Sequence, residues 1–176
     1  LACMLAALLA ACASPVPQMI REAPPVGVSL AETRARGDAA RGTRVRWGGT
    51  VAGLENRATE TWIEIVERAL AADGQPRTDD QTGGRFLARV EGFLDPAIHA
   101  TGRSITVAGT VEGFLTRAIG AYPYTYTVIK AEGFYLWPLP ERETFYREPY
   151  WPHGYDPWYP WHPGGYPWPW PYPYRW

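Results

Sequence analysis

Five stretches of this chain alternate apolar and polar residues with a period of two, and several of them contain glycine. A period of two is typical of strands with one buried face, and the stretches are rich in β-branched and aromatic residues. They are residues 43–54, 59–68, 84–91, 104–114 and 124–137. Glycines inside strands mark bulges and sharp bends, and here they are Gly48, Gly49, Gly53, Gly109 and Gly113. The pattern predicts an all-β fold, an OB-like barrel of five to six strands with one or two short helices; a two-sheet sandwich is the alternative.

One short motif occurs twice along the predicted strands. Gly49-Thr-Val-Ala-Gly-Leu54 is echoed by Gly109-Thr-Val-Glu-Gly-Phe114, so we expect two strands that bend at equivalent corners of the barrel. Ahead of the strands, Ser29 and Glu32 have the spacing of a capping box. This spacing predicts a short helix over residues 29–37.

The first residues have the pattern of a bacterial lipoprotein signal. Residues 1–11 are uncharged and too few to cross a bilayer as a helix, which takes about 20 apolar residues, but they fit the apolar region of a signal peptide. We expect them to be the remnant of a signal whose charged front part is missing. Leu9-Ala-Ala-Cys12 then matches the lipobox, in which the cysteine thiol receives a diacylglyceryl group before cleavage. Cys12 is therefore the predicted lipidation site.

Composition divides the rest of the chain into three parts. Residues 12–28 are small and Pro-rich, which predicts an extended, lipidated tether. Residues 29–137 have globular composition and suffice for one domain, the predicted barrel. With Cys3 removed in the signal and Cys12 lipidated, no disulfide is available, so the domain depends on its core.

The C-terminal segment, residues 138–176, holds 11 of the 18 prolines, 6 of the 9 tryptophans and 7 of the 11 tyrosines. Proline at this density excludes helix and sheet, so we expect a disordered, extended tail. Exposed aromatic surface favours a partner: the membrane interface, glycan or peptidoglycan, or an envelope protein that binds Pro-rich chains. Contact with the membrane or envelope surface ranks first. The predicted contact residues are Trp158, Trp161, Trp168 and Trp170.

No pattern of residues indicates catalysis. Asp95, His99 and Ser104 are the residue types of a hydrolytic triad, but Ser104 lacks the nucleophile-elbow pattern. Asp95 precedes a proline and fits better as the start of a short helical turn that runs to His99. We predict no catalytic residues and no enzymatic activity.

Metal and cofactor sites find equally little support. His153 and His162 are nine residues apart in the tail, with Asp156 between them. This spacing matches no common metal site, and no cysteine ligand is available. We predict neither a metal site nor a cofactor.

The charged residues leave two interpretations open. Arg85, Arg89 and Arg103 either gather on one barrel face and bind an anion, or pair with glutamates. The scattered glutamates are Glu55, Glu60, Glu64, Glu67 and Glu91. The net charge is −1, which together with export argues against nucleic acid as a partner.

Several stretches together resemble the Slp family of outer-membrane lipoproteins, named for a starvation-inducible member. They are Val45–Gly49, Thr61–Ile65, Gly84–Phe86, Gly92–Pro96, Gly102–Arg103, Val107–Val111, Ile119–Gly120 and Leu136–Pro138, which cover about 45 to 138 in the family's order. The resemblance implies an outer-membrane location and a domain in the periplasm or on the surface. It implies no enzymatic activity and no assigned active-site residues. Residues 139–176 go beyond the expected family pattern.

Two classes of function follow. The first is an outer-membrane lipoprotein, anchored through Cys12 and facing the periplasm, with a non-enzymatic structural or interaction role in the cell envelope. The alternative is a lipid-tethered binding domain for a small ligand or glycan. The alternative needs a concave pocket with convergent polar groups, whereas a filled barrel without a pocket favours the first.

Overall fold

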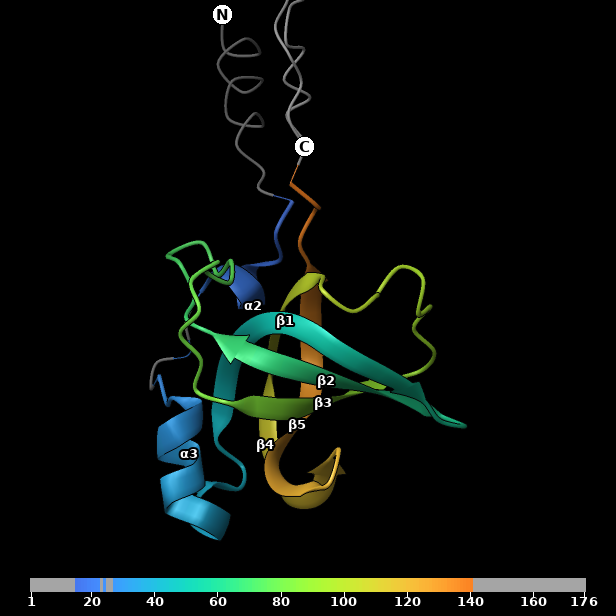
Figure 1. The fold of residues 1–176 in the computed structure, drawn as a ribbon. Coiled ribbons are helices and arrows are strands. Elements are labelled where there is room, and N and C mark those ends of the chain that lie inside the picture. The colour runs from blue at the N-terminus through green and yellow to red at the C-terminus, as the bar shows by residue number, and fades with distance from the viewer. Residues whose placement is uncertain (1–14, 23, 25–26, 141–176) are drawn as a thin grey trace, which may run out of the picture. The chain divides into compact units, whose positions relative to one another are not determined.

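The structure, a computed structural model, describes residues 15–22, 24 and 27–140 of the 176-residue chain. This part forms five strands and three short helices (Figure 1). The strands are β1 (Arg44–Asn56), β2 (Glu60–Arg68), β3 (Arg85–Glu91), β4 (Ser104–Ile119) and β5 (Tyr122–Leu136). The helices are α2 (Gln18–Arg21), α3 (Leu30–Arg36) and the 3-10 helix η2 (Gly37–Ala40).

The five strands close into a barrel in the order β1-β2-β3-β5-β4, with β4 returning to β1. All neighbours are antiparallel except β3 and β5, which run parallel. The length of β1 lets it serve two neighbours, since residues 44–50 pair with β4 and residues 48–56 pair with β2. The predicted all-β, OB-like barrel is confirmed with five strands, and the two-sheet sandwich is excluded.

Two glycines allow neighbouring strands to approach closely. A Cβ atom at Gly49 would overlap the carbonyl oxygen of Val66 on β2. A Cβ atom at Gly109 would overlap the carbonyl oxygen of Lys130 on β5 in the same way. Only glycine therefore fits at these two points, where the chain of a neighbouring strand occupies the space of a side chain.

The second glycine of each motif copy lies where the pairing between two strands shifts its register. The β1–β2 register shifts between Val51 and Gly53, and the β4–β5 register shifts between Val111 and Gly113. Such bulges bend a strand and increase its twist. The expectation that the two copies mark equivalent bends is confirmed.

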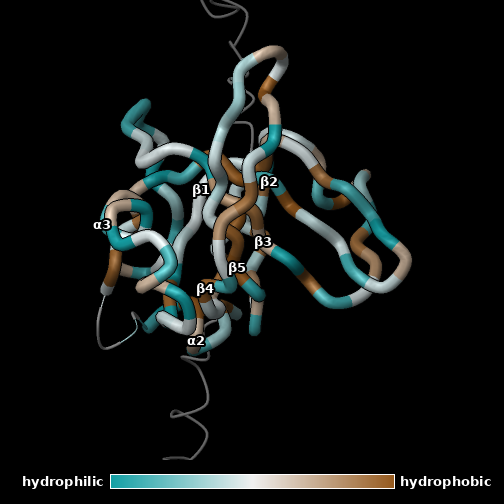
Figure 2. The backbone as a smooth tube through the Cα atoms, turned by 90° about the horizontal axis from the view of Figure 1, so that it is seen from below, coloured by the Kyte–Doolittle hydropathy of each residue, from teal (hydrophilic) through white to brown (hydrophobic). Residues whose placement is uncertain are grey.

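Apolar side chains from all five strands fill the barrel (Figure 2, where brown stretches lie in the central strands). Among the members with no exposed surface are Ile63, Ile65, Phe86, Ile105 and Ile129. Trp47 packs edge-on against Phe86, with ring centroids 5.5 Å apart. Its indole N–H donates to the carbonyl of Val28 at 2.8 Å, which satisfies the one polar group of this large core residue.

The predicted first helix is confirmed as α3, together with its capping box. The Ser29 hydroxyl accepts from the Glu32 N–H at 3.1 Å, and the Glu32 carboxylate accepts from the Ser29 N–H at 2.8 Å. The helix ends at Gly37, which has a φ of 55° and so suits glycine. Leu30 on this helix is buried in the barrel core, so the helix is packed against the barrel.

The β4–β5 hairpin is longer than the sequence pattern predicted. β4 continues to Ile119, five residues past the expected end, and β5 begins at Tyr122. Gly120, with a φ of 61°, makes the turn. Pro123 is tolerated because it lies at the start of its strand. The extension matters because it reaches the outer face of the barrel described below.

The described part of the expected tether is folded. Residues 18–21 form α2, and Val16 and Ile20 are buried with Ala108 and Trp137. Val16 lies just before α2 and Ile20 lies within it, and the burial of both side chains draws this segment onto the barrel. The extended interval expected over residues 12–28 is therefore replaced by a packed helix in this region.

The signal remnant (residues 1–11), Cys12 and the tail beyond Pro140 lie outside the described residues. The predicted contact residues Trp158, Trp161, Trp168 and Trp170 lie outside them as well. Among the helices that are described, none has the length and apolar character needed to span a membrane.

The two glycines of the first motif copy provide a stability test. Gly49→Ala should destabilise the protein by about 1–3 kcal/mol, because the new methyl group meets the Val66 carbonyl in a packed sheet. Gly53→Ala is the matched control: its nearest neighbour atom would be 3.8 Å away, so we expect a change within about 1 kcal/mol, of either sign. Urea unfolding of the purified protein measures both. Equal losses would contradict the assignment of Gly49 as the point of close approach.

Candidate functional site on the outer face of the barrel

The outward face of β2 and β3 is the surface that OB barrels commonly use for binding. Along β2, the partly exposed Glu60, Trp62 and Glu64 alternate with buried residues, which is the pattern of a strand with one face in the core. Arg85 and Arg89 on β3 are likewise partly exposed. Charged and aromatic side chains thus share this face.

An apolar cluster covers part of the same face. Leu87 of β3 is buried with Tyr126 and Val128 of β5, although it points away from the barrel core. Leu115 and Ile119, from the extension of β4, pack against this cluster. The far part of the β4–β5 hairpin thus lies over the sheet, and the face is not an open platform.

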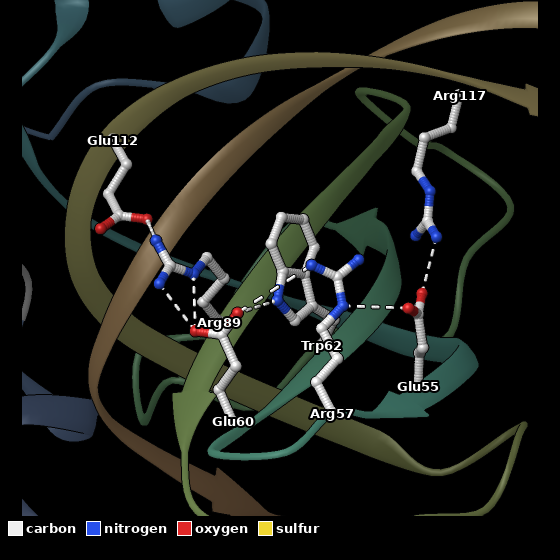
Figure 3. Close-up of polar contacts among 7 residues, drawn as sticks. All are labelled: Glu55, Arg57, Glu60, Trp62, Arg89, Glu112 and Arg117. Carbon is white, nitrogen blue, oxygen red and sulfur yellow. Dashed lines mark hydrogen bonds and ion pairs between the residues drawn. The ribbon is translucent and has the colours of Figure 1, made fainter.

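Beside this cluster, six charged side chains form an alternating chain of contacts, which we call the Arg-Glu ladder (Figure 3). Its members, in order, are Arg117, Glu55, Arg57, Glu60, Arg89 and Glu112. Arg117 lies 2.6 Å from Glu55, and Arg89 lies 2.7 Å from Glu60. Three positive and three negative groups leave the ladder without net charge.

Trp62 lies under the middle of the ladder (Figure 3). The guanidinium carbon of Arg57 is 4.0 Å from the centre of the indole ring, a cation–π contact. The indole N–H donates to the Glu60 carboxylate at 2.6 Å. One face of the ring and its only donor are therefore engaged within the protein.

The contacts within the Arg-Glu ladder shift the pKa values of several of its members. The hydrogen bond from Arg89 holds the pKa of the Glu60 carboxyl below its ordinary value, and the hydrogen bond from Arg117 does the same for the pKa of Glu55. Glu60 in turn raises the pKa of Arg89. Nearby, burial raises the pKa of Tyr126 to about 12, so its hydroxyl stays protonated and donates to Glu64 at 2.9 Å.

A shallow hollow opens next to the ladder. Its volume is about 250 Å³, and its lining residues are Thr59, Glu60, Arg89, Glu91, Lys130 and Ala131. Pockets that enclose a drug-sized ligand usually have about 300–1,000 Å³ and a mainly apolar lining. This hollow is smaller and more polar, so it does not supply the concave pocket that the ligand-binding hypothesis requires.

Of the three arginines expected either to gather or to pair with glutamates, two are found paired. Arg85 contacts Glu64 at 2.6 Å, and Arg89 contacts two glutamates of the ladder. Arg103 shares no partner with these two and instead donates to the carbonyls of Ile98 and Trp137. The interpretation as an anion-binding cluster is therefore wrong for these three arginines.

The remaining glutamates also have ordinary roles. Glu67 accepts from the backbone N–H of Gly83. Glu91 is exposed at the end of β3 and lines the hollow.

The residue types of a hydrolytic triad do not assemble. The Asp95 carboxylate caps its own turn by accepting from the Ala97 N–H at 2.8 Å, as the sequence predicted. His99 contacts the Asp95 carbonyl through Nδ1 and packs its ring against Phe134. Ser104 uses its carbonyl to accept from the N–H of Trp137. In the described residues these three side chains share no hydrogen bond.

A metal site is not formed in the described part of the chain either, since no three His, Cys, Asp or Glu side chains gather there. His153, Asp156 and His162 lie outside the described residues.

Four members of this site were missed by the sequence: Arg57, Trp62, Glu112 and Arg117. Glu112 and Arg117 could not be predicted, because the long hairpin brings them to their partners from the other half of the domain. Arg57 and Trp62 contact residues close to them in the chain, but their spacing matches no known motif.

Comparison with known proteins identifies the family. The profile described as "Outer membrane lipoprotein Slp family" matches residues 9–175. The chain belongs to the Slp family. The outer membrane protein Slp of Escherichia coli K12 is 33% identical over 156 residues, which is 87% of this chain and 81% of that protein. The uncharacterized lipoprotein YeaY of the same organism is 32% identical over 123 residues, which is 65% of this chain and 63% of that protein. The chain thus spans less than two thirds of the length of YeaY.

Among solved structures, a small single-stranded DNA-binding protein from Streptomyces coelicolor matches with a TM-score of 0.37 and 18% identity, over 54% of this chain and 94% of that one.

The Slp family membership confirms the resemblance seen in the sequence and makes the protein a lipoprotein of the cell envelope. The relatives are named as outer membrane proteins and lipoproteins, not as enzymes. The match to residue 175 also shows that the aromatic tail lies within the family pattern. The expectation that residues 139–176 go beyond it was wrong.

The lowered pKa values of Glu55 and Glu60 make the ladder's contribution depend on pH. A carboxyl with a lowered pKa stabilises the fold above its unfolded value of about 4.3 and loses this contribution as the pH falls through the lowered value. Arg89→Gln should therefore cost about 1 kcal/mol at pH 7, and the difference in unfolding free energy from the parent protein should narrow as the pH falls below about 5.

The control for this test is Arg77→Gln, which removes a well-exposed pair with Asp79. It should change the free energy of unfolding by less than about 0.5 kcal/mol at every pH. Urea unfolding across the pH series measures both variants. A gap for Arg89→Gln that stays constant down to pH 3 would show that Arg89 does not act through the carboxylates.

Proposed function

We propose that this Slp family protein is anchored in the outer membrane through lipid on Cys12, faces the periplasm, and has a non-enzymatic structural or interaction role. The lipobox at Leu9–Cys12 and the family match support the anchor and the location. A single acyl chain holds a protein only marginally, whereas two or more chains make release negligible.

The observation that carries the role is the closure of the outer barrel face. The β4–β5 hairpin covers the apolar cluster around Leu87, and the Arg-Glu ladder pairs its charges internally. The adjacent hollow of about 250 Å³ is too small to enclose a typical ligand. These features favour contact through a broad, neutral surface over capture of a small ligand or glycan by the barrel.

The absence of enzymatic activity is part of the same proposal. Catalysis by a side-chain nucleophile needs an adjacent base within hydrogen-bond reach, and Ser104 and His99 do not meet this requirement.

The tail contributes a second contact in this proposal. Trp158, Trp161, Trp168 and Trp170 carry large aromatic surfaces, and such surfaces tend to be placed against a partner. The membrane interface comes first, followed by glycan or peptidoglycan and by envelope proteins.

The lipid anchor is tested by mass spectrometry of the mature N-terminus from fractionated cell envelopes. We expect a lipid-modified peptide that begins at Cys12, found in the outer membrane fraction and lost in Cys12→Ser. Cys3→Ser is the matched control, because Cys3 is removed with the signal and its loss should leave the modification intact. An unmodified N-terminus in the soluble periplasm would overturn the anchor.

Protease accessibility tests on which side of the outer membrane the domain lies. A periplasmic domain is cleaved by added protease only after the outer membrane is permeabilised, whereas cleavage in intact cells would place the domain on the surface.

A further inference from the structure

The N-terminal segment is held at one end of the barrel, beside the end of β5 (Figure 1). Val16 and Ile20 are 9% and 0% exposed and share a cluster with Trp137, the first residue after β5. The two borders of the folded domain therefore meet at this end.

Two hydrogen bonds and one close packing contact hold α2 in place. One nitrogen of the Arg46 guanidinium donates to the carbonyls of Ile20 at 2.8 Å and Arg21 at 2.6 Å, which satisfies carbonyls that a helix leaves without partners at its C-terminus. Gly74 packs so closely on the Ile20 carbonyl that a Cβ atom would overlap it.

Trp137 is fixed by a buried hydrogen-bond relay. Its indole N–H donates to the Thr106 hydroxyl at 2.9 Å, and that hydroxyl donates to the Gly74 carbonyl at 2.7 Å. The Trp137 carbonyl accepts from Arg103 at 3.0 Å. Residue 16 is therefore a fixed point of the fold and not part of a free linker.

This fixed point limits how far the barrel can stand from the membrane. Cys12 precedes Val16 by four residues, which span at most about 14 Å when fully extended. The lipid holds Cys12 at the membrane surface, so the end of the barrel that carries α2 stays within that distance. The Pro-rich stretch after Val16 cannot lengthen the connection, because α2 and its contacts already fix the chain there.

More than half of the exposed large apolar side chains of the described residues lie near the same end. Three of the five exposed large hydrophobics of the described residues are Met19 at 40%, Ile98 at 55% and Leu139 at 65%. Met19 is on α2, Leu139 follows Trp137, and Ile98 is joined to the Trp137 carbonyl through Arg103. The other two lie elsewhere: Tyr122, at 69%, is at the far tip of the β4–β5 hairpin. Phe93, at 72%, follows Gly92, whose N–H donates to the Thr59 carbonyl beside the β1–β2 hairpin.

We propose that this end of the barrel rests on the membrane, with Met19, Ile98 and Leu139 among the lipid headgroups. The proposal rests on lipidation of Cys12. It also orients the domain: the Arg-Glu ladder, which includes Glu112 and Arg117 from the far part of β4, faces away from the bilayer. Membrane contact and contact with a partner are thereby assigned to different parts of the domain.

The test uses the lipidated full chain in vesicles of phosphatidylethanolamine and phosphatidylglycerol. Single cysteines are introduced by Leu139→Cys, Ile98→Cys and, as the matched exposed control, Tyr122→Cys. Each carries an environment-sensitive fluorophore, and a fraction of the lipids carries a nitroxide on the headgroup. We expect several-fold stronger quenching at positions 139 and 98 than at position 122.

Flotation of the vesicles distinguishes failure of the lipid anchor from failure of the proposed orientation. A protein that floats with the vesicles but shows equal quenching at all three positions overturns the resting orientation and leaves the anchor intact. A protein that does not float overturns the anchor, and the orientation with it.

Discussion

The barrel depends on two places where the backbone of one strand occupies the space that a side chain would take on its neighbour. Gly49 faces the Val66 carbonyl and Gly109 faces the Lys130 carbonyl. Because these contacts are between backbones, strands β1 and β4 can coil tightly, and the bulges that follow each glycine turn them further. Closure of a five-stranded sheet with a filled interior follows from this geometry.

The bent β4–β5 hairpin changes what the outer face can do. Leucine and tyrosine side chains that would form a platform are covered by Leu115 and Ile119 of the same hairpin. The charges around them pair along the ladder, so the surface offers neither a field of one sign nor a free aromatic plate. A fold that elsewhere supports ligand binding is here adapted to a neutral, closed surface.

The sequence predicted what depends on local patterns and missed what depends on distant contacts. The capping box of α3 and the repeated glycine motif involve residues close along the chain, and both were confirmed. The packing of Val16 was missed because its partner Trp137 comes from the other border of the domain, while the prolines around it suggested a linker. The pairing of Arg117 with Glu55 was equally invisible, since only the finished hairpin brings them together.

The contact between the two borders of the domain also bears on how it folds. β1 pairs with β4, and Val16 and Ile20 are buried only once Ala108 and Trp137 are in place. Contacts so distant along the chain carry a large loop-closure cost before they stabilise anything, which makes folding slow compared with helical domains. A chain that ends before Trp137 would leave α2 without its main apolar partner, so the domain is expected to become stable only when β5 and Trp137 are present.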